Sequence, residues 1–370
     1  ELSIQKLLVL INKPEKFIDP SFKGDFVSGK IKHFTQNFTS DGNSKLKVLL
    51  ITGPQGSGKT RLAINLAEET IQEYNKTNPN GNGLNNWILF GDCDELNQSG
   101  SGVPFEPFSQ ALHEILGAGR FEPPAKKANK IKEGINSTGL GNILDVAGLG
   151  VLNLILGAQD EEVKSATTSE MVQIIIQTLE GLSKTRPVIF IIDDLHWIDP
   201  ITNTMFENLL TKLSQESTRN ILFIFTSRIE KETEASSNAD PIKYLKQCNN
   251  EEVIELKEIA HEEFEYTDRF EELLIRSLYF DRYSAQRYLN YINSYDVRSI
   301  LSFLQTIKSI IDQDGIEIIE DRVKIISKFD FSRLRPPTDI INIIDQQLQT
   351  LTDSQLQIIK FASFIGHEFR

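Results

Sequence analysis

Cysteine is scarce in this sequence of 370 residues, which contains only Cys93 and Cys248. Two thiols cannot form the disulfide framework of a secreted protein of this length, and their spacing does not match a zinc site. The sequence also opens without the basic and apolar segments of a signal peptide. We therefore expect a cytoplasmic protein that is kept in the reducing interior of a cell.

Positive charge is also in short supply. The chain carries 39 Lys and Arg against 52 Asp and Glu, which gives a formal net charge of −13 and a pI near 5.0. Nucleic-acid-binding surfaces need an excess of Lys and Arg, so we expect no nucleic-acid partner through this segment. A small anionic ligand is not excluded, because a phosphate site depends on local geometry rather than on total charge.

Long uninterrupted apolar runs are absent as well. The nearest candidate, from Gly139 to Ala158, contains Asn142, Asp145 and Asn153 and is interrupted by glycines. A bilayer span requires about 20 mainly apolar residues, and an Asp in its middle is costly. We expect no membrane span and interpret this stretch as a buried or partner-facing pair of helices.

The length of the chain predicts two or three domains. Its composition, 39% hydrophobic and 25% charged, is that of a globular protein. The first residue is Glu rather than Met, and the last, Arg370, stands in an apolar pattern. We expect the sequence to be a piece of a larger polypeptide.

What the sequence does contain is a complete G-x-x-x-x-G-K-[ST] motif. Residues 53 to 60 read GPQGSGKT; they follow the apolar run Val48–Ile51 and precede apolar residues with helical spacing that begin at Leu62. Strand, glycine-rich loop and helix is the context that this motif requires. The pattern predicts a phosphate-binding loop.

Each residue type in this loop has a physical reason to be there. Glycines at 53, 56 and 58 let the backbone turn its N–H groups toward phosphate oxygens. The helix that follows directs its positive dipole end at the same phosphates. The Lys59 ammonium can reach the β- and γ-phosphates, and the Thr60 hydroxyl can bind Mg²⁺.

A second motif, VIFIIDDLHWIDP, runs from Val188 to Pro200. Its five apolar residues predict a buried strand that ends in two adjacent carboxylates, Asp193 and Asp194. In a phosphate-loop fold such a strand ends beside the loop, where its terminal Asp helps to hold Mg²⁺. We expect Asp193 to bind the metal ion and Asp194 to orient the attacking water.

Three nearby residues allow weaker predictions. Asp199 before Pro200 is typical of a helix N-cap, so we interpret it as structural. His196 lacks an evident partner in the sequence, and we favour a packing or hydrogen-bonding role over a direct catalytic one. Arg228 follows a third apolar run, and it is either a sensor of the γ-phosphate or an ordinary surface arginine.

The pairing of GPQGSGKT with IIDDLHWIDP resembles the STAND class of AAA+-related signal-transduction NTPases. More narrowly, it is similar to the ATPase module that accompanies class III adenylyl cyclases and LuxR-type regulators. The stretches Trp87–Glu95, Val103–Leu116 and Arg335–Phe369 resemble further parts of that module.

This resemblance implies an α/β fold of the P-loop NTPase type. A parallel five-stranded sheet in the order 5-1-4-3-2 would be flanked by helices and followed by a helical lid and the start of a winged-helix domain. Together with the sequence pattern, it divides the chain into a helical lead-in (1–45), the NTPase core (46–257), the lid with a β-hairpin (258–334) and the truncated winged helix (335–370).

The resemblance also implies that the chain binds ATP or ADP with Mg²⁺. Thr60 and Asp193 would hold the metal ion, while Lys59, Asp194 and Arg228 would act at the γ-phosphate. The residues expected to contact the nucleotide are Gly53, Pro54, Gln55, Gly56, Ser57, Gly58, Lys59, Thr60 and Arg61.

Three departures from the family pattern point to slow hydrolysis or plain retention of nucleotide. Phe22-Lys23-Gly24-Asp25 has Asp where the family has Arg, and Asp296-Val297-Arg298 replaces a Gly-Asn-Pro element of the lid. The second acid is Asp194 rather than the Glu of fast AAA+ motors, so its carboxylate reaches less far toward water.

Three functions are compatible with these residues. The leading hypothesis is a nucleotide-dependent switch that regulates a larger signalling protein, such as an adenylate or guanylate cyclase, through other domains of the same polypeptide and protein partners. A scaffold that keeps ATP as a structural cofactor is the second. An AAA+ remodelling motor is the third, and the absence of Glu at position 194 counts against it.

Overall fold

The structure, a computed structural model, divides into two compact units that we describe separately. Unit 1 comprises Glu1–Gly24, Gln55–Gly58 and Lys257–Arg370, and unit 2 comprises Asp25–Pro54 and Lys59–Leu256. The residues that the structure describes are 2–12, 46–77, 87–93, 105–115, 168–183, 187–215, 220–228, 251–255, 270–295, 297, 299–337, 340–349 and 351–365.

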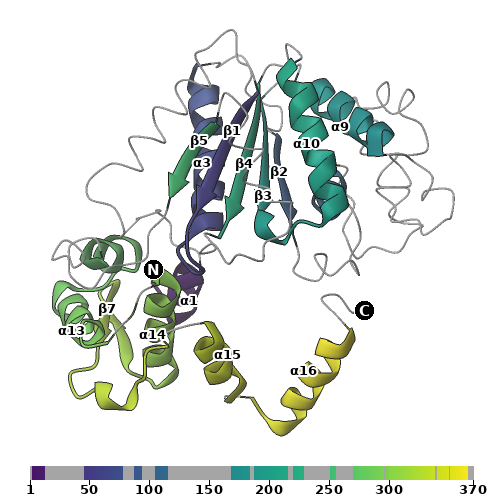
Figure 1. Ribbon diagram of the computed structural model, residues 1–370. Helices are drawn as coiled ribbons and strands as arrows, with labels where there is room; N and C mark the ends of the chain where they lie inside the picture. Colours follow the sequence, from purple (N-terminus) through teal and green to yellow (C-terminus); the bar gives the residue numbers. More distant parts are fainter. Residues whose placement is uncertain are drawn as a thin grey trace. The chain divides into compact units, whose positions relative to one another are not determined.

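Unit 2 is built on a five-stranded parallel sheet (Figure 1). Its strand order is β2-β3-β4-β1-β5, or 5-1-4-3-2 when read from the other edge. Every residue of β3 and β4 is buried, as expected for near-continuous apolar strands covered on both faces. The strands are β1 (Lys47–Thr52), β2 (Trp87–Asp92), β3 (Val188–Asp193), β4 (Ile221–Ser227) and β5 (Glu251–Glu255).

Helices cover both faces of this sheet, because alternate side chains of each strand point to opposite sides. On one face, Phe190 and Phe223 of the strands pack with Phe108 and Phe206 of the helices. The other face packs against α3, whose Leu62 is fully buried. The helices are α3 (Lys59–Thr77), α5 (Glu106–Ile115), α9 (Thr168–Ser183) and α10 (Pro200–Gln215).

The strand pairing brings polar residues together at one edge of the sheet. Thr52 pairs with Ser227 at the ends of β1 and β4, and Asp92 pairs with Asp193 at the ends of β2 and β3. All four are the last residues of their strands. The carboxyl ends of the parallel strands therefore form a polar edge above an apolar core.

Unit 1 is mainly helical, with a separate core of its own. Phe270, Tyr288 and Phe303 lie at its centre and are fully buried. Its elements are α1 (Ile4–Asn12), the π-helical turn η4 (Leu273–Ser277), α13 (Arg282–Ile292), α14 (Ile300–Asp312), β6 (Ile316–Ile319), β7 (Arg322–Ile325), the 3₁₀ turn η5 (Phe331–Arg333), α15 (Ile340–Gln349) and α16 (Asp353–Ile365).

The β-hairpin expected in unit 1 is present. Strands β6 and β7 pair in antiparallel fashion, and the two-residue loop between them, Glu320 and Asp321, has φ angles of 53° and 54°. Positive φ at both positions is typical of a type I′ turn. Helix α1 packs with α14, and the Leu2 N–H donates to Asp321 Oδ1 at 2.7 Å, so residues from the start of the chain complete this unit.

Several sequence predictions fall outside the described residues. They include the Phe22–Asp25 element, the stretch Gly139–Ala158, and Asp296 and Arg298 of the lid. Within the described ranges, no helix is long and apolar enough to cross a membrane. Helices α15 and α16 occupy the region predicted to begin a winged helix, and that assignment stays a prediction.

Candidate functional site

The glycine-rich loop connects β1 to α3 at the polar edge of the sheet. Gly56 and Gly58 have φ angles of 76° and 91°, a region that residues with a Cβ rarely adopt. The Gly53 N–H donates to the Ser227 carbonyl at 3.2 Å, which ties the start of the loop to β4. The sequence expectation that these positions need glycine is confirmed at Gly56 and Gly58.

Lys59, the first residue of α3, is buried, with 6% of its surface exposed. Its Nζ donates to the Pro54 carbonyl at 3.0 Å, which uses one of three ammonium donors. Burial lowers the pKa of Lys59, Arg228 lowers it further, and the carboxylates of Asp194 and Asp193 oppose the shift. The Lys59 ammonium is thus a buried cation, hydrogen-bonded to a carbonyl of the same loop, and it is suited to bind an anionic ligand.

Asp193, at the end of β3, accepts hydrogen bonds from two hydroxyls. The Thr60 hydroxyl lies 2.7 Å from Oδ2 and 3.0 Å from Oδ1, and the Thr226 hydroxyl donates to Oδ1 at 2.5 Å. Burial raises the pKa of Asp193, and the two hydroxyls and Lys59 hold the shift back while Asp194 adds to it. Residues 133 positions apart thus meet as the sequence motifs predict.

Asp194 differs from Asp193 in backbone conformation and in the exposure of its side chain. Its φ of 51° and ψ of 45° place it in the left-handed region, and its side chain is 34% exposed. The Asp194 N–H donates to the Thr226 hydroxyl at 3.0 Å. The left-handed turn directs the two adjacent carboxylates differently, and Thr226 contacts both residues.

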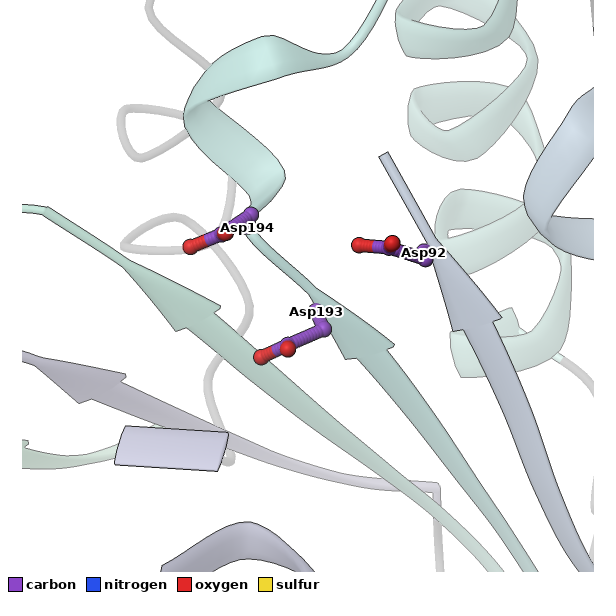
Figure 2. Close-up of side chains that lie close together, drawn as sticks. All are labelled: Asp92, Asp193 and Asp194. Atoms are coloured by element: carbon purple, nitrogen blue, oxygen red, sulfur yellow. The ribbon is translucent and has the colours of Figure 1, made fainter. Parts of the chain in front are cut away.

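A third carboxylate, Asp92 at the end of β2, lies beside this pair (Figure 2). One oxygen from each of Asp92, Asp193 and Asp194 lies within 4.8 Å of the others. The Asp92 N–H donates to Gln110 Oε1 at 2.7 Å. A Cβ on Gly91 would approach the Pro107 carbonyl to 2.4 Å, so the end of β2 is pressed against α5.

These oxygen atoms fit a magnesium ion. Carboxylates and a threonine hydroxyl are hard oxygen donors, the type that Mg²⁺ prefers. The neighbouring Cys93 is buried, and burial together with the surrounding carboxylates raises the pKa of its thiol well above the usual range. When bound, Mg²⁺ would neutralise part of the negative charge at this edge.

His196 and Trp197 lie in the 3₁₀ turn η3 (Leu195–Trp197), directly after the acidic pair. His196 Nδ1 accepts a hydrogen bond from the Arg228 N–H at 3.4 Å. The Arg228 guanidinium carbon lies 5.5 Å from the centre of the Trp197 ring. The sequence left His196 without an evident partner, and the structure supplies one in Arg228, the residue that follows β4.

The pKa of His196 is lowered to about 4 by burial, with contributions from Arg228 and Lys59. His196 is therefore neutral near pH 7, and its 3.9 Å approach to Asp194 is not an ion pair under those conditions. Neutral imidazole can accept from the Arg228 N–H, which agrees with the hydrogen-bonding role favoured by the sequence.

Asp199 caps α10, as its position before Pro200 predicts. Its Oδ1 accepts from the N–H groups of Ile201 and Thr202 at 3.0 and 2.9 Å. The Thr202 hydroxyl also donates to Asp199 and accepts from the Phe105 N–H at 2.8 Å. Asp199 therefore has a structural role and takes no part in the hydrogen bonds of Asp193, the other buried carboxylate.

The structure brings together Lys59, Thr60, Asp193 and Asp194, and it places Arg228 close enough to influence the pKa of Lys59. Their roles toward a ligand stay predictions. Of the remaining loop residues, Gln55 is exposed, whereas Pro54, Ser57 and Arg61 are half-buried.

Two residues of the site, Asp92 and Thr226, were not among the site residues predicted from the sequence. Asp92 ends an expected strand and could have been found by the same rule that found Asp193, since the carboxyl ends of parallel strands share one edge. Thr226 precedes Arg228 at the end of β4, but nothing local indicates which side chain of this stretch faces Asp193.

A model of the family described as AAA ATPase domain matches residues 30–224 of the chain. A curated relative, the uncharacterized protein R02095 of Rhizobium meliloti (strain 1021), is 24% identical over 203 residues, or 53% of this chain. The match spans only 18% of the relative's own length.

Three solved structures show a weak likeness to this chain. Aeropyrum pernix ORC1, in complex with DNA, gives a TM-score of 0.47 at 11% identity over 86% of this chain and 66% of its own. The Walker-type ATPase PABY2304 of Pyrococcus abyssi gives 0.43 at 11% over 96% and 80%. Cdc6p of Pyrobaculum aerophilum gives 0.43 at 9% over 83% and 66%. All three TM-scores are too low to carry ligands or partners over to this chain.

Proposed function

This chain belongs to the AAA ATPase domain family, and on that premise we propose that it is an ATP-binding, slowly hydrolysing switch of the STAND type. ATP with Mg²⁺ would occupy the polar edge of the parallel sheet. Hydrolysis or loss of the γ-phosphate would change the contacts that hold the nucleotide-bound arrangement. The switch would regulate a larger signalling protein, for which a nucleotide cyclase is one candidate.

One observation carries the binding part of this proposal. The Thr60 hydroxyl, the Asp193 carboxylate and the buried Lys59 ammonium converge from the glycine-rich loop and from β3. Lys59 and Asp193 both carry charge that burial disfavours, as their pKa shifts show. A triphosphate would complement the cation, and Mg²⁺ would complement the carboxylate.

The slow hydrolysis part is supported by Asp194. An Asp is one methylene shorter than the Glu that serves fast motors, and this Asp stands in a left-handed turn with its N–H held by Thr226. Its backbone is therefore fixed beside β3, and the shorter side chain brings its carboxylate less far toward a water molecule than a Glu would. Slow turnover is the behaviour that a switch needs, since its nucleotide state must persist.

The regulatory part is supported by the size of the curated relative. The matched segment spans about a fifth of that protein, so this type of domain occurs there beside much additional chain. A switch domain acts on such neighbouring segments or on protein partners. The identity of the output stays part of the proposal.

The test compares nucleotide binding and γ-phosphate release in the natural chain and in two variants. Lys59→Ala removes the buried ammonium. Lys76→Ala is the control: Lys76 lies at the other end of the same helix, and its side chain is 71% exposed. The natural chain and Lys76→Ala should bind fluorescent ATP and release phosphate over minutes or longer. Lys59→Ala should lose both properties, because the phosphate charge is no longer neutralised.

Other outcomes select the alternatives. Rapid turnover that rises with protein concentration would support a remodelling motor. Retained ATP with no release over hours would support a scaffold with a structural nucleotide. If the natural chain binds neither ATP nor ADP in the presence of Mg²⁺, the proposal is wrong.

A further inference from the structure

The turn after the acidic pair of β3 contacts the residue that follows β4. Two contacts from neighbouring residues of η3 hold Arg228: His196 Nδ1 accepts from its backbone N–H at 3.4 Å, and the Trp197 ring lies 5.5 Å from its guanidinium carbon. One contact positions the backbone and the other positions the side chain. Both come from elements of unit 2.

The Trp197 ring is itself held in place. Its backbone N–H donates to the Asp194 carbonyl at 2.9 Å, its ring packs against the apolar core of the sheet, and it lies 4.9 Å from the His196 ring. A half-buried indole anchored in this way presents one defined face to Arg228. The ring can therefore act as a rigid support for a long side chain that otherwise has many rotamers.

Arg228 lies at the charged edge of the sheet. Its positive charge lowers the pKa of both Lys59 and His196, so the guanidinium lies within electrostatic range of both groups. In the part of the chain that the structure describes, Arg228 forms no ion pair within 4.0 Å. An aromatic face attracts the guanidinium without using any of its five N–H donors.

We propose that Trp197 is a positioning residue for Arg228. The indole ring orients the guanidinium so that its N–H donors meet the γ-phosphate of ATP, and this arrangement lets the site distinguish ATP from ADP. The inference rests on the proposed function, since it concerns the same nucleotide. It adds a residue and a role: Trp197 determines nucleotide specificity without contacting the nucleotide.

The chemistry favours this arrangement. A planar guanidinium can stack on an aromatic ring and still donate in its own plane to a phosphate. The hydrogen bonds it makes to phosphate are charge-assisted and stronger than those between neutral groups. ADP lacks the γ-phosphate that would accept them, so the benefit of holding Arg228 in place appears only with ATP.

The first test measures the ratio of ADP to ATP dissociation constants. We expect Trp197→Leu to lower the preference for ATP about tenfold while changing ADP affinity little, and Trp197→Phe to retain most of the preference because it keeps an aromatic face. Tyr283→Leu is the matched control, because it removes a ring that lies 5.9 Å from Arg287 in unit 1. It should leave the ratio unchanged.

The second test keeps Trp197 and uses it as a reporter. The chain contains two tryptophans, so Trp87→Phe leaves Trp197 as the sole indole. Its fluorescence should change on addition of Mg²⁺ with a non-hydrolysable ATP analogue and not with Mg²⁺ and ADP. Arg228→Met in the same background should abolish that difference. This measurement remains available if Trp197→Leu does not fold.

The outcomes separate the two proposals. If no nucleotide binds to the natural chain, the proposed function fails. If ATP and ADP bind but Trp197→Leu preserves their ratio, or if the sole Trp197 responds equally to both nucleotides, only the role of Trp197 fails. If Trp197 had only a structural role, Trp197→Leu would lower the thermal stability of the chain and weaken the binding of ATP and of ADP to the same extent.

Discussion

The two units of this protein bury different kinds of polar residue. In unit 2, Lys59, Asp193 and Asp199 are buried together with several hydroxyls. Among the described residues of unit 1, the buried polar residues are serines and threonines, and none carries a charge. Burying a charge without a partner costs far more than burying a hydroxyl, so the charges in unit 2 need a separate explanation.

Buried hydroxyls in unit 1 are accounted for largely by its architecture. The Ser284 hydroxyl donates to Asp281 at the start of α13 and accepts from the Ile325 N–H, which fixes the hairpin to that helix. The Thr306 hydroxyl donates to the Ser302 carbonyl within α14. The Ser284 hydroxyl thus joins a helix start to the hairpin, the Thr306 hydroxyl is satisfied within its own helix, and neither implies a ligand.

In unit 2, stabilisation of the fold explains only one of the three buried charged residues. Asp199 caps α10, whereas Lys59 and Asp193 stabilise no helix end and lie together at the carboxyl edge of the sheet. A buried charge with a perturbed pKa that caps no helix is a candidate for a binding site. The comparison thus separates stabilising polar groups from functional ones, and four predictions test it.

The largest effect is expected in the core of unit 1. Phe303 is fully buried, with its ring 4.3 Å from that of Phe270 and 5.0 Å from that of Tyr288. Phe303→Ala should lower the free energy of unfolding by about 3–5 kcal/mol, because it creates a cavity. Phe361 on α16 is 72% exposed, and Phe361→Ala should change stability by less than about 0.5 kcal/mol. Urea unfolding of both variants checks this, and equal losses would contradict it.

The second prediction separates stability from binding in unit 2. Asp193→Asn removes a buried charge whose raised pKa shows that the fold disfavours it, so the nucleotide-free variant should be at least as stable as the natural chain. Saturating Mg²⁺ and ATP should stabilise the natural chain by about 2.7 kcal/mol at 100 times the dissociation constant. The variant should lose most of this gain, because it lacks the anionic metal ligand.

Thermal unfolding with and without nucleotide measures both quantities. Asp92→Asn is the graded control: Asp92 is half-buried and lies beside Asp193, so its loss should reduce the gain less. A nucleotide-free Asp193→Asn that unfolds far more readily would assign Asp193 a structural role instead.

The third prediction concerns pH and His196. The folded pKa of about 4 lies below the ordinary value of 6.5, so the unfolded chain binds the proton more readily than the folded chain. This contribution to stability is present above pH 6.5 and is lost as the pH falls toward 4. Between pH 7 and 5 the loss should reach about 2 kcal/mol in the nucleotide-free chain.

His196→Asn keeps an acceptor for the Arg228 N–H and has no group that titrates in this range. The stability difference between the natural chain and this variant should therefore change with pH in the direction just stated. Guanidinium chloride unfolding at pH 5, 6 and 7 measures it. A difference that is constant with pH would contradict the burial of neutral His196.

The smallest effects are expected at two helix caps, one in each unit. Asp281 caps α13 by accepting from the Ser284 N–H at 2.9 Å, and Asp199 caps α10. Each change to Ala should lower the free energy of unfolding by about 1 kcal/mol. Both changes leave a buried hydroxyl without its acceptor, but Asp199→Ala should be the more costly, since the buried Asp199 also accepts from two backbone N–H groups and the half-buried Asp281 from one. Denaturant unfolding checks the order, and a reversed order would contradict this reasoning.

The local parts of the fold and the site could be predicted from the sequence. The glycine-rich loop between strand and helix, the acidic end of β3, the cap at Asp199 and the hairpin of β6 and β7 all depend on residues within a few positions of one another. Backbone geometry, glycine conformations and side-chain period are local properties, so the pattern of residue types is enough to indicate them.

The tertiary structure decided which distant residues meet. Asp92 lies beside Asp193 because β2 and β3 pair in a register that aligns their last residues, and Thr226 reaches the same carboxylate from β4. The contact between Trp197 and Arg228, and the place of α1 among helices from the far end of the chain, arise in the same way. Strand order, register and packing result from the burial of whole faces, which no short stretch of sequence specifies by itself.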